Sequence, residues 1–127
     1  MAAARFFLVA GALSTALAVM LGAFGAHGLR GRLPADLMAI YQTACQYHVY
    51  HALGLLAVGL LAMSLPASAV LRWSGGLMLA GTLLFSGSLY LLAVSGQRWL
   101  GAITPLGGTA WIIAWLLLAW AVRGLGR

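Results

Sequence analysis

Four apolar runs, separated by short polar breaks, account for most of the chain. Each run is long enough to cross a hydrocarbon layer of ~30 Å as a helix that rises ~1.5 Å per residue. The breaks are rich in glycine, proline, serine and arginine, which are typical of helix ends and turns. The pattern predicts an all-α, integral membrane four-helix bundle in one domain, 1–127, with spans of approximately 6–26, 44–63, 73–94 and 105–122.

Residues at the breaks predict where individual helices begin. Asp36 stands where the side chain of an N-cap residue would accept hydrogen bonds from the first free N–H groups of the second helix. Pro105 fits the first turn of the fourth helix, which needs no N–H there. The second helix, Asp36–Met63, would be ~42 Å long, which exceeds the hydrocarbon thickness. Its N-terminal portion should therefore be interfacial.

Composition supports a membrane environment. Only 6% of the residues are charged and 64% are hydrophobic, whereas soluble domains carry about 25% charged residues. The net charge of +6 comes from arginines alone, and these are scattered singly along the chain. A nucleic-acid partner would require a continuous basic stripe, so no nucleic acid is expected. The expected partner is the lipid bilayer, with the arginines as anchors at its edges.

The N-terminus also has features of a secretory signal. Arg5, the apolar run that follows it and Ala16-Leu-Ala18 resemble a signal peptide with its cleavage site. However, the apolar run continues without a break as far as Ala26. A retained first transmembrane helix is therefore the favoured interpretation.

The arginines give the topology a weak bias. With four spans, both termini and the second break share a side that bears Arg5, Arg72, Arg123 and Arg127, against Arg30, Arg32 and Arg98 on the other side. The positive-inside rule then favours cytoplasmic termini. We expect a multi-pass protein of the bacterial inner membrane.

A stripe of small residues recurs every four positions along the first helix. Its members are Ala10, Ser14, Ala18, Gly22 and Ala26. Small residues allow membrane helices to approach closely. The stripe indicates either packing within the bundle, which we favour, or the seam of a homo-oligomer.

Polar side chains gather in the half of the bundle that contains the first and third breaks. Tyr41–His51 is the most polar and aromatic stretch of the chain, and His48 and His51 are ~60° apart around a helix, so that Tyr47, His48 and His51 can share a face. Histidines within a membrane normally face the bundle interior. The helical rise brings other polar residues to the same depth. We predict one polar pocket formed by His27, Tyr47, His48, His51, Ser86, Ser88 and Thr104.

These residues have side chains that could serve several chemistries. Copper or zinc could be bound by a thiolate and imidazoles, which Cys45, His48, His51 and His27 would supply. However, the i,i+3 steps around the helix direct Cys45 and His51 away from each other, and no carboxylate is near to orient an imidazole. Haem lacks a clear second axial ligand, and a hydrolase lacks an acid to orient its base. A quinone or lipid headgroup is harder to exclude. We therefore predict no metal, no cofactor and no enzymatic activity, with the polar groups bonding across helices.

Four ordered segments carry a resemblance over nearly the whole chain. They are Gly22-Ala-Phe-Gly-Ala-His-Gly-Leu29, Tyr41-Gln-Thr-Ala-Cys-Gln-Tyr-His-Val-Tyr-His-Ala-Leu53, Leu84-Phe-Ser-Gly-Ser-Leu-Tyr-Leu91 and Ile103-Thr-Pro-Leu-Gly-Gly108. In these segments the chain resembles the domain-of-unknown-function 423 family, which comprises bacterial YgdD-like inner-membrane proteins and eukaryotic transmembrane protein 256. The resemblance implies a small integral membrane protein without established activity, and it brings no catalytic or ligand residues. Cys45 stands where a small apolar residue is expected, which argues against a thiol role.

Two functions remain as hypotheses. The first is a non-enzymatic membrane component that binds a lipid, a quinone or a partner protein through the one-sided polar pocket. The alternative is a small-solute or proton transporter or channel, as an oligomer, with His48 and His51 as a relay. The apolar character of the other half of the bundle argues against a conduit.

Overall fold

The computed structural model describes residues 1–126, and every element within that range is helical. Arg127, one of the four arginines predicted on the membrane side that bears both termini, lies outside the described residues. In chain order the elements are α1 (Ala2–Phe24), η1 (Gly25–Leu29), α2 (Ala35–Ser64), α3 (Ala69–Gly81), η2 (Thr82–Ser86), α4 (Gly87–Ser95), η3 (Arg98–Ala102) and α5 (Thr104–Val122).

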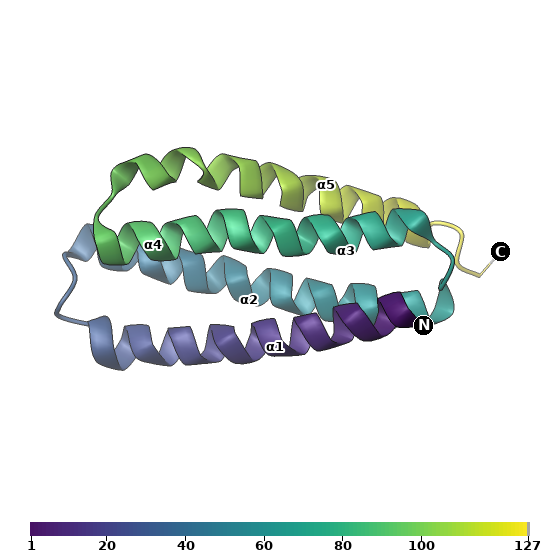
Figure 1. Cartoon of the computed structure of the whole chain (residues 1–127), viewed down its shortest axis with the longest axis horizontal. Helices are drawn as coiled ribbons and strands as arrows, with labels where there is room; N and C mark the ends of the chain where they lie inside the picture. The colour runs from purple at the N-terminus through teal and green to yellow at the C-terminus, as the bar shows by residue number, and fades with distance from the viewer. Residues whose placement is uncertain (127) are drawn as a thin grey trace.

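These elements form four long antiparallel rods (Figure 1). The π-helical turns η1 and η2 continue their rods without a break, so the rods span Ala2–Leu29, Ala35–Ser64, Ala69–Ser95 and Arg98–Val122. Each rod is long and apolar enough to cross a membrane. The predicted all-α transmembrane four-helix fold is confirmed.

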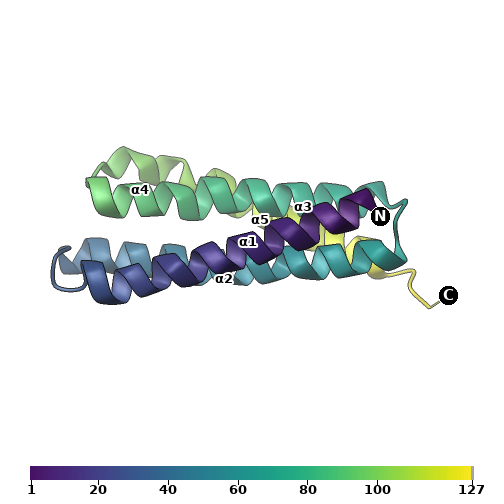
Figure 2. The same ribbon diagram turned by 60° about the horizontal axis from the view of Figure 1, so that its bottom comes forward.

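The N-terminus and the C-terminal end of α5 lie at one end of the bundle, together with the turn between α2 and α3 (Figures 1 and 2). We call this the termini end. The opposite end, which we call the loop end, holds the connections 30–34 and 96–97. Since α2 is 30 residues long, it reaches ~45 Å, and its first turn at the loop end extends beyond ~30 Å of hydrocarbon.

The helix ends confirm some of the local predictions and correct one. Pro105 lies in the first turn of α5, as predicted. The Ser68 hydroxyl caps α3 by accepting from the Leu71 N–H at 3.1 Å. The prediction that Asp36 caps α2 is wrong, because the N-cap residue is Pro34 and its side chain makes no cap bond. Asp36 lies instead in the first turn, where its carboxylate accepts a hydrogen bond from Arg98.

The Asp36–Arg98 ion pair joins the first turn of α2 to η3 at the loop end. The hydrogen bond from the Arg98 guanidinium holds the pKa of the Asp36 carboxyl below its usual value. Both side chains are more than half exposed, at 57% and 63%, so solvent screens the pair.

Asp36→Asn is therefore expected to leave the thermal stability of the protein in detergent almost unchanged at neutral pH. Because the carboxyl pKa is lowered on folding, any contribution of the pair is present at neutral pH and is lost as the pH falls through that lowered pKa. Melting curves of both proteins at pH 7 and in acid check this. A clear fall in Tm for the variant at pH 7 would show that the pair is a structural clamp.

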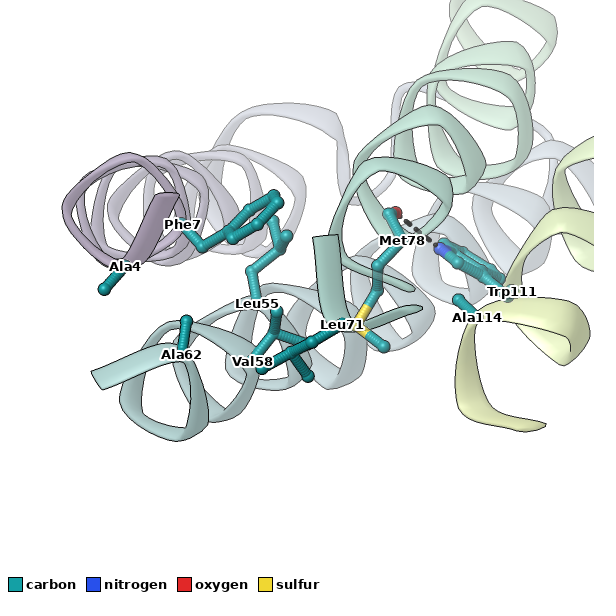
Figure 3. Close-up of a cluster of buried hydrophobic side chains, with 9 residues drawn as sticks. All are labelled: Ala4, Phe7, Leu55, Val58, Ala62, Leu71, Met78, Trp111 and Ala114. Carbon is teal, nitrogen blue, oxygen red and sulfur yellow. Dashed lines mark hydrogen bonds between the residues drawn. The ribbon is translucent and has the colours of Figure 1, made fainter. Parts of the chain in front are cut away.

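A cluster of buried apolar side chains lies in the half of the bundle nearer the termini end. Its members, drawn in Figure 3, are Ala4, Phe7, Leu55, Val58, Ala62, Leu71, Met78, Trp111 and Ala114. The polar groups within this half are paired with backbone: Trp111 Nε1–H donates to the Met78 carbonyl at 3.0 Å, and the Ser74 hydroxyl donates to the Ala114 carbonyl at 2.7 Å. The predicted division into an apolar half and a more polar half is present.

The small-residue stripe of α1 lies partly inside the bundle. Ala18 is 2% exposed, and the Ser14 hydroxyl bonds to a side chain of α2. Two of the five stripe residues therefore pack as the intrabundle interpretation predicts, whereas Ala26 is exposed. The homo-oligomer interpretation stays a prediction.

Candidate functional site

His48 connects three of the four rods. Its Nε2 lies 2.9 Å from the Ser14 hydroxyl of α1, and its Nδ1 lies 2.9 Å from the Tyr90 hydroxyl of α4. The imidazole is only 3% exposed. Both ring nitrogens are thus paired, as a histidine within a membrane requires.

The Ser14–His48–Tyr90 chain holds more protons than its hydrogen bonds use. Two hydroxyls and one neutral imidazole carry three N–H or O–H protons, and the chain has two bonds. If Nδ1 carries the imidazole proton, the Tyr90 hydroxyl proton remains free to donate. If Nε2 carries it, the Ser14 proton remains free instead. Either tautomer leaves one hydroxyl proton unused within the chain, and the Cys45 sulfur lies beside the Tyr90 hydroxyl as one acceptor for it.

A groove of about 290 Å³ lies beside this chain, between α1 and the α3–α4 rod. It is lined by Leu13, Ser14, Leu17, Leu21, His48, Leu79, Thr82, Leu83, Ser86, Gly87 and Tyr90. We call it the α1–α4 groove. Leu13 and Leu83 on its wall are 67% and 70% exposed, so the groove opens sideways on the surface that the bilayer covers. Its surface is formed almost wholly by apolar atoms, and the polar residues His48, Thr82 and Ser86 are buried beside it.

His51 faces a different neighbour. Its ring stacks on Trp111 of α5, with centroids 3.6 Å apart and planes within 5°, and its Nδ1–H donates to the Tyr47 carbonyl at 2.7 Å. The expectation that His48 and His51 share one pocket is therefore not met. An offset of ~60° around α2 is enough to direct one ring toward α1 and α4 and the other toward α5.

The remaining predicted pocket residues are distributed as follows. Ser86 borders the α1–α4 groove and donates its hydroxyl proton to the Ala44 carbonyl at 2.9 Å. Ser88 pairs with Thr104 of α5 at 2.7 Å, which ties α4 to α5. Tyr47 is 40% exposed and packs against Phe85 and Trp111. His27 is exposed on η1 at the loop end. Of the predicted set, His48 and Ser86 border one groove, Ser88 pairs with Thr104, and Tyr47 contacts His51. The seven residues therefore do not form the single pocket that was predicted.

Two hydrogen-bonding partners of His48 were not predicted from the sequence. Ser14 was noticed only as a member of the small-residue stripe, and Tyr90 ends the Ser-Gly-Ser-Leu-Tyr segment without a polar neighbour of its own. A further buried tyrosine, Tyr41, donates to the Leu21 carbonyl at 2.5 Å and packs edge-on against Tyr90, with ring centroids 5.3 Å apart. The spacing of polar residues within α4 was the only available signal for Tyr90.

Within residues 1–126, no three histidine, cysteine or acidic side chains lie close enough to hold a metal ion. Cys45 is half-buried and lines a second groove, between α1 and α2, which is described below. The arrangement of the described residues is suited to hydrogen bonding and to apolar contact.

Comparison with known proteins places the chain in a family. The profile of a protein family of unknown function, DUF423, matches residues 21–108. The chain belongs to the DUF423 family. It is 51% identical over 114 residues to the UPF0382 membrane protein YwdK of Bacillus subtilis, and this match covers 90% of the chain and 93% of YwdK. It is 49% identical over 114 residues to a UPF0382 membrane protein of Staphylococcus epidermidis, covering 90% of the chain and 92% of that relative.

This DUF423 protein is an integral membrane protein of a family whose function is unknown, which agrees with the resemblance noted from its four segments. The matched range contains His48, Ser86 and Tyr90 and begins after Ser14. No solved structure matches the fold significantly.

Proposed function

We propose that the protein is a non-enzymatic lipid-binding component of the membrane. Its ligand is a carbonyl-bearing membrane lipid, either a prenyl quinone or a glycerolipid, with an apolar chain in the α1–α4 groove. The observation that supports this most is the free proton of the Ser14–His48–Tyr90 chain beside a leucine-walled groove. An apolar chain would cover the leucines, and a carbonyl oxygen would accept the remaining proton.

The position of the groove fits a ligand that arrives from the bilayer. On α2, His48 lies 13 residues from the start of the helix, or ~20 Å along its axis, which is well inside a 45 Å rod. At this depth water does not compete for the free donor. A hydrogen bond from it therefore stabilises a bound ligand more than the same bond would at the membrane surface. The groove opens sideways, so a lipid reaches it without crossing the bundle.

The disposition of charge supports a binding role over catalysis. Nucleophilic catalysis needs a nucleophile, a base and a group that orients the base. The only acidic side chain of the chain, Asp36, is paired with Arg98 at the loop end. His48 is held by two hydroxyls, which orient it without raising its basicity as a carboxylate would.

A transport role receives less support. The apolar cluster around Leu55 and Met78 fills the half of the bundle nearer the termini end. A polar path through one chain would have to cross this cluster. The transport hypothesis therefore requires an oligomer, with a path between copies.

We further propose that the protein resides in the bacterial inner membrane with its termini in the cytoplasm. The termini end carries Arg5, Arg72 and Arg123, whereas at the loop end Asp36 neutralises Arg98 and leaves Arg30 and Arg32. Labelling of single cysteines introduced at each end of intact cells tests this orientation, and labelling of the termini end from outside would contradict it.

Filling the groove is expected to abolish lipid retention. A Cβ atom at Gly87 would meet only the Thr82 carbonyl oxygen, at 4.0 Å, so the leucine of Gly87→Leu has room to extend into the groove. Native mass spectrometry of gently purified protein should show a bound lipid in the parent protein and its loss in this variant. The bound mass distinguishes a quinone from a glycerolipid.

Gly76→Leu is the matched control, because a Cβ at Gly76 meets nothing within 4 Å and Gly76 is an exposed residue of α3 outside the groove. This variant should retain the lipid. Tyr90→Phe should weaken retention and leave the groove walls unchanged. A parent protein that carries no lipid, or equal retention by Gly87→Leu and Gly76→Leu, would contradict the proposal.

A further inference from the structure

We propose that a second groove, between α1 and α2 at the loop end, binds an anionic phospholipid through Arg30. This α1–α2 groove measures about 530 Å³ and is lined by both helices. It is separate from the α1–α4 groove, and the two share no lining residue. The inference is therefore independent of the function proposed above.

Charge favours an anion in the α1–α2 groove. Arg30 stands at its mouth, directly after the last residue of η1. The only acidic side chain in the sequence, Asp36, is bound by Arg98. No acidic side chain remains to neutralise Arg30, so its guanidinium is available to the phosphate of a lipid at the membrane surface.

Two amides lie beside Arg30 in the same groove. Gln42 and Gln46 are one turn apart on α2, and both line the groove. The Gln46 amide nitrogen donates to the Tyr50 hydroxyl at 2.7 Å, which holds that side chain in place. Amide and guanidinium N–H groups donate hydrogen bonds, and phosphate and glycerol oxygens accept them.

The groove has the length and depth of a phospholipid that lies with its headgroup at the interface. The wall formed by α1, η1 and Arg30 begins at Ala18 and extends ~18 Å along the helix axis, from inside the hydrocarbon to the loop end. The side chains on this wall are small at Ala18, Gly22 and Ala26, and a Cβ atom at Gly22 would meet nothing within 4 Å. An acyl chain thus has space along the small residues while its phosphate reaches Arg30.

The test compares phosphatidylglycerol with phosphatidylcholine. The full-length protein is reconstituted into nanodiscs that contain equal amounts of the two lipids, released into mild detergent, and examined by native mass spectrometry for the lipid that stays bound. We expect the parent protein to retain phosphatidylglycerol about fivefold over phosphatidylcholine, the ratio that one arginine near the surface provides. Arg30→Gln should reduce this ratio to near one.

Three further variants separate this site from general charge and from the other groove. Arg32→Gln removes the same charge at the same end but not from the groove lining, so it should keep the preference. Gly22→Leu should lose the bound phosphatidylglycerol by filling the space, whereas Gly87→Leu should keep it. No preference in the parent protein, or an equal loss in Arg30→Gln and Arg32→Gln, overturns the proposal. Melting curves confirm that each variant is folded.

Discussion

Replacing Gly107 with alanine is expected to lower the free energy of unfolding by about 3 kcal/mol, at the upper end of the usual cost of overpacking. Gly107 is buried at the end of the first turn of α5, where this helix packs on η2. A Cβ atom there would collide with the backbone nitrogen of Phe85 and would lie 2.9 Å from the Gly81 carbonyl oxygen. Because these are backbone atoms, no side-chain rotation relieves the contact, and α5 must move away from η2.

Gly108→Ala is the matched control for this prediction. The nearest atoms to a Cβ at Gly108 are on the Phe85 ring, at 3.7 and 3.8 Å, which is ordinary contact. Alanine is favoured over glycine in a helix by ~0.5–1 kcal/mol, so this variant should be as stable as the parent protein or slightly more stable. Unfolding of the three proteins in mixed micelles, followed by circular dichroism, gives the comparison. Equal stability of the two variants would show that α5 does not pack closely on η2.

The arrangement of the helices follows closely from the sequence. Four apolar runs require four spans. The last span, predicted at 105–122, coincides with Thr104–Val122 to within one residue, whereas those predicted at 6–26, 44–63 and 73–94 lie inside the longer rods Ala2–Leu29, Ala35–Ser64 and Ala69–Ser95. The division into two halves was also predictable, because helical rise alone converts residue number into depth. The π-helical turns at Gly25–Leu29 and Thr82–Ser86 were not, since they leave no mark in composition or spacing.

The candidate site was only partly predictable, for a geometric reason. Depth placed His48 and Ser86 together correctly, and both border the α1–α4 groove. Depth does not say which rod lies on which side of α2. His51 was therefore grouped with His48, although its ring stacks on Trp111 of α5. For the same reason Ser14 and Tyr90, which are far apart in the sequence, could not be identified as partners of His48.

His48→Ala is expected to lower the free energy of unfolding by roughly 2–4 kcal/mol, most of it from the cavity that a large buried side chain leaves. The remainder comes from two hydrogen bonds between rods, each contributing ~0.6 kcal/mol on average in membrane proteins. Unfolding in mixed micelles measures the loss. His51→Phe should cost less, because the ring can still stack on Trp111 and only the bond within α2 is removed.

A double-mutant cycle shows whether His48 stabilises the bundle through its hydrogen bond to Tyr90 or only by filling space. Tyr90→Phe removes one hydroxyl and keeps the ring that packs on Tyr41. If the hydrogen bond to His48 is formed, Tyr90→Phe should destabilise the parent protein but have little effect when His48 is already alanine. Additive losses would mean that the two side chains do not interact. The Ser14–His48–Tyr90 chain would then not be formed as described, and the proposal that it presents one ordered donor to the α1–α4 groove would lose its basis.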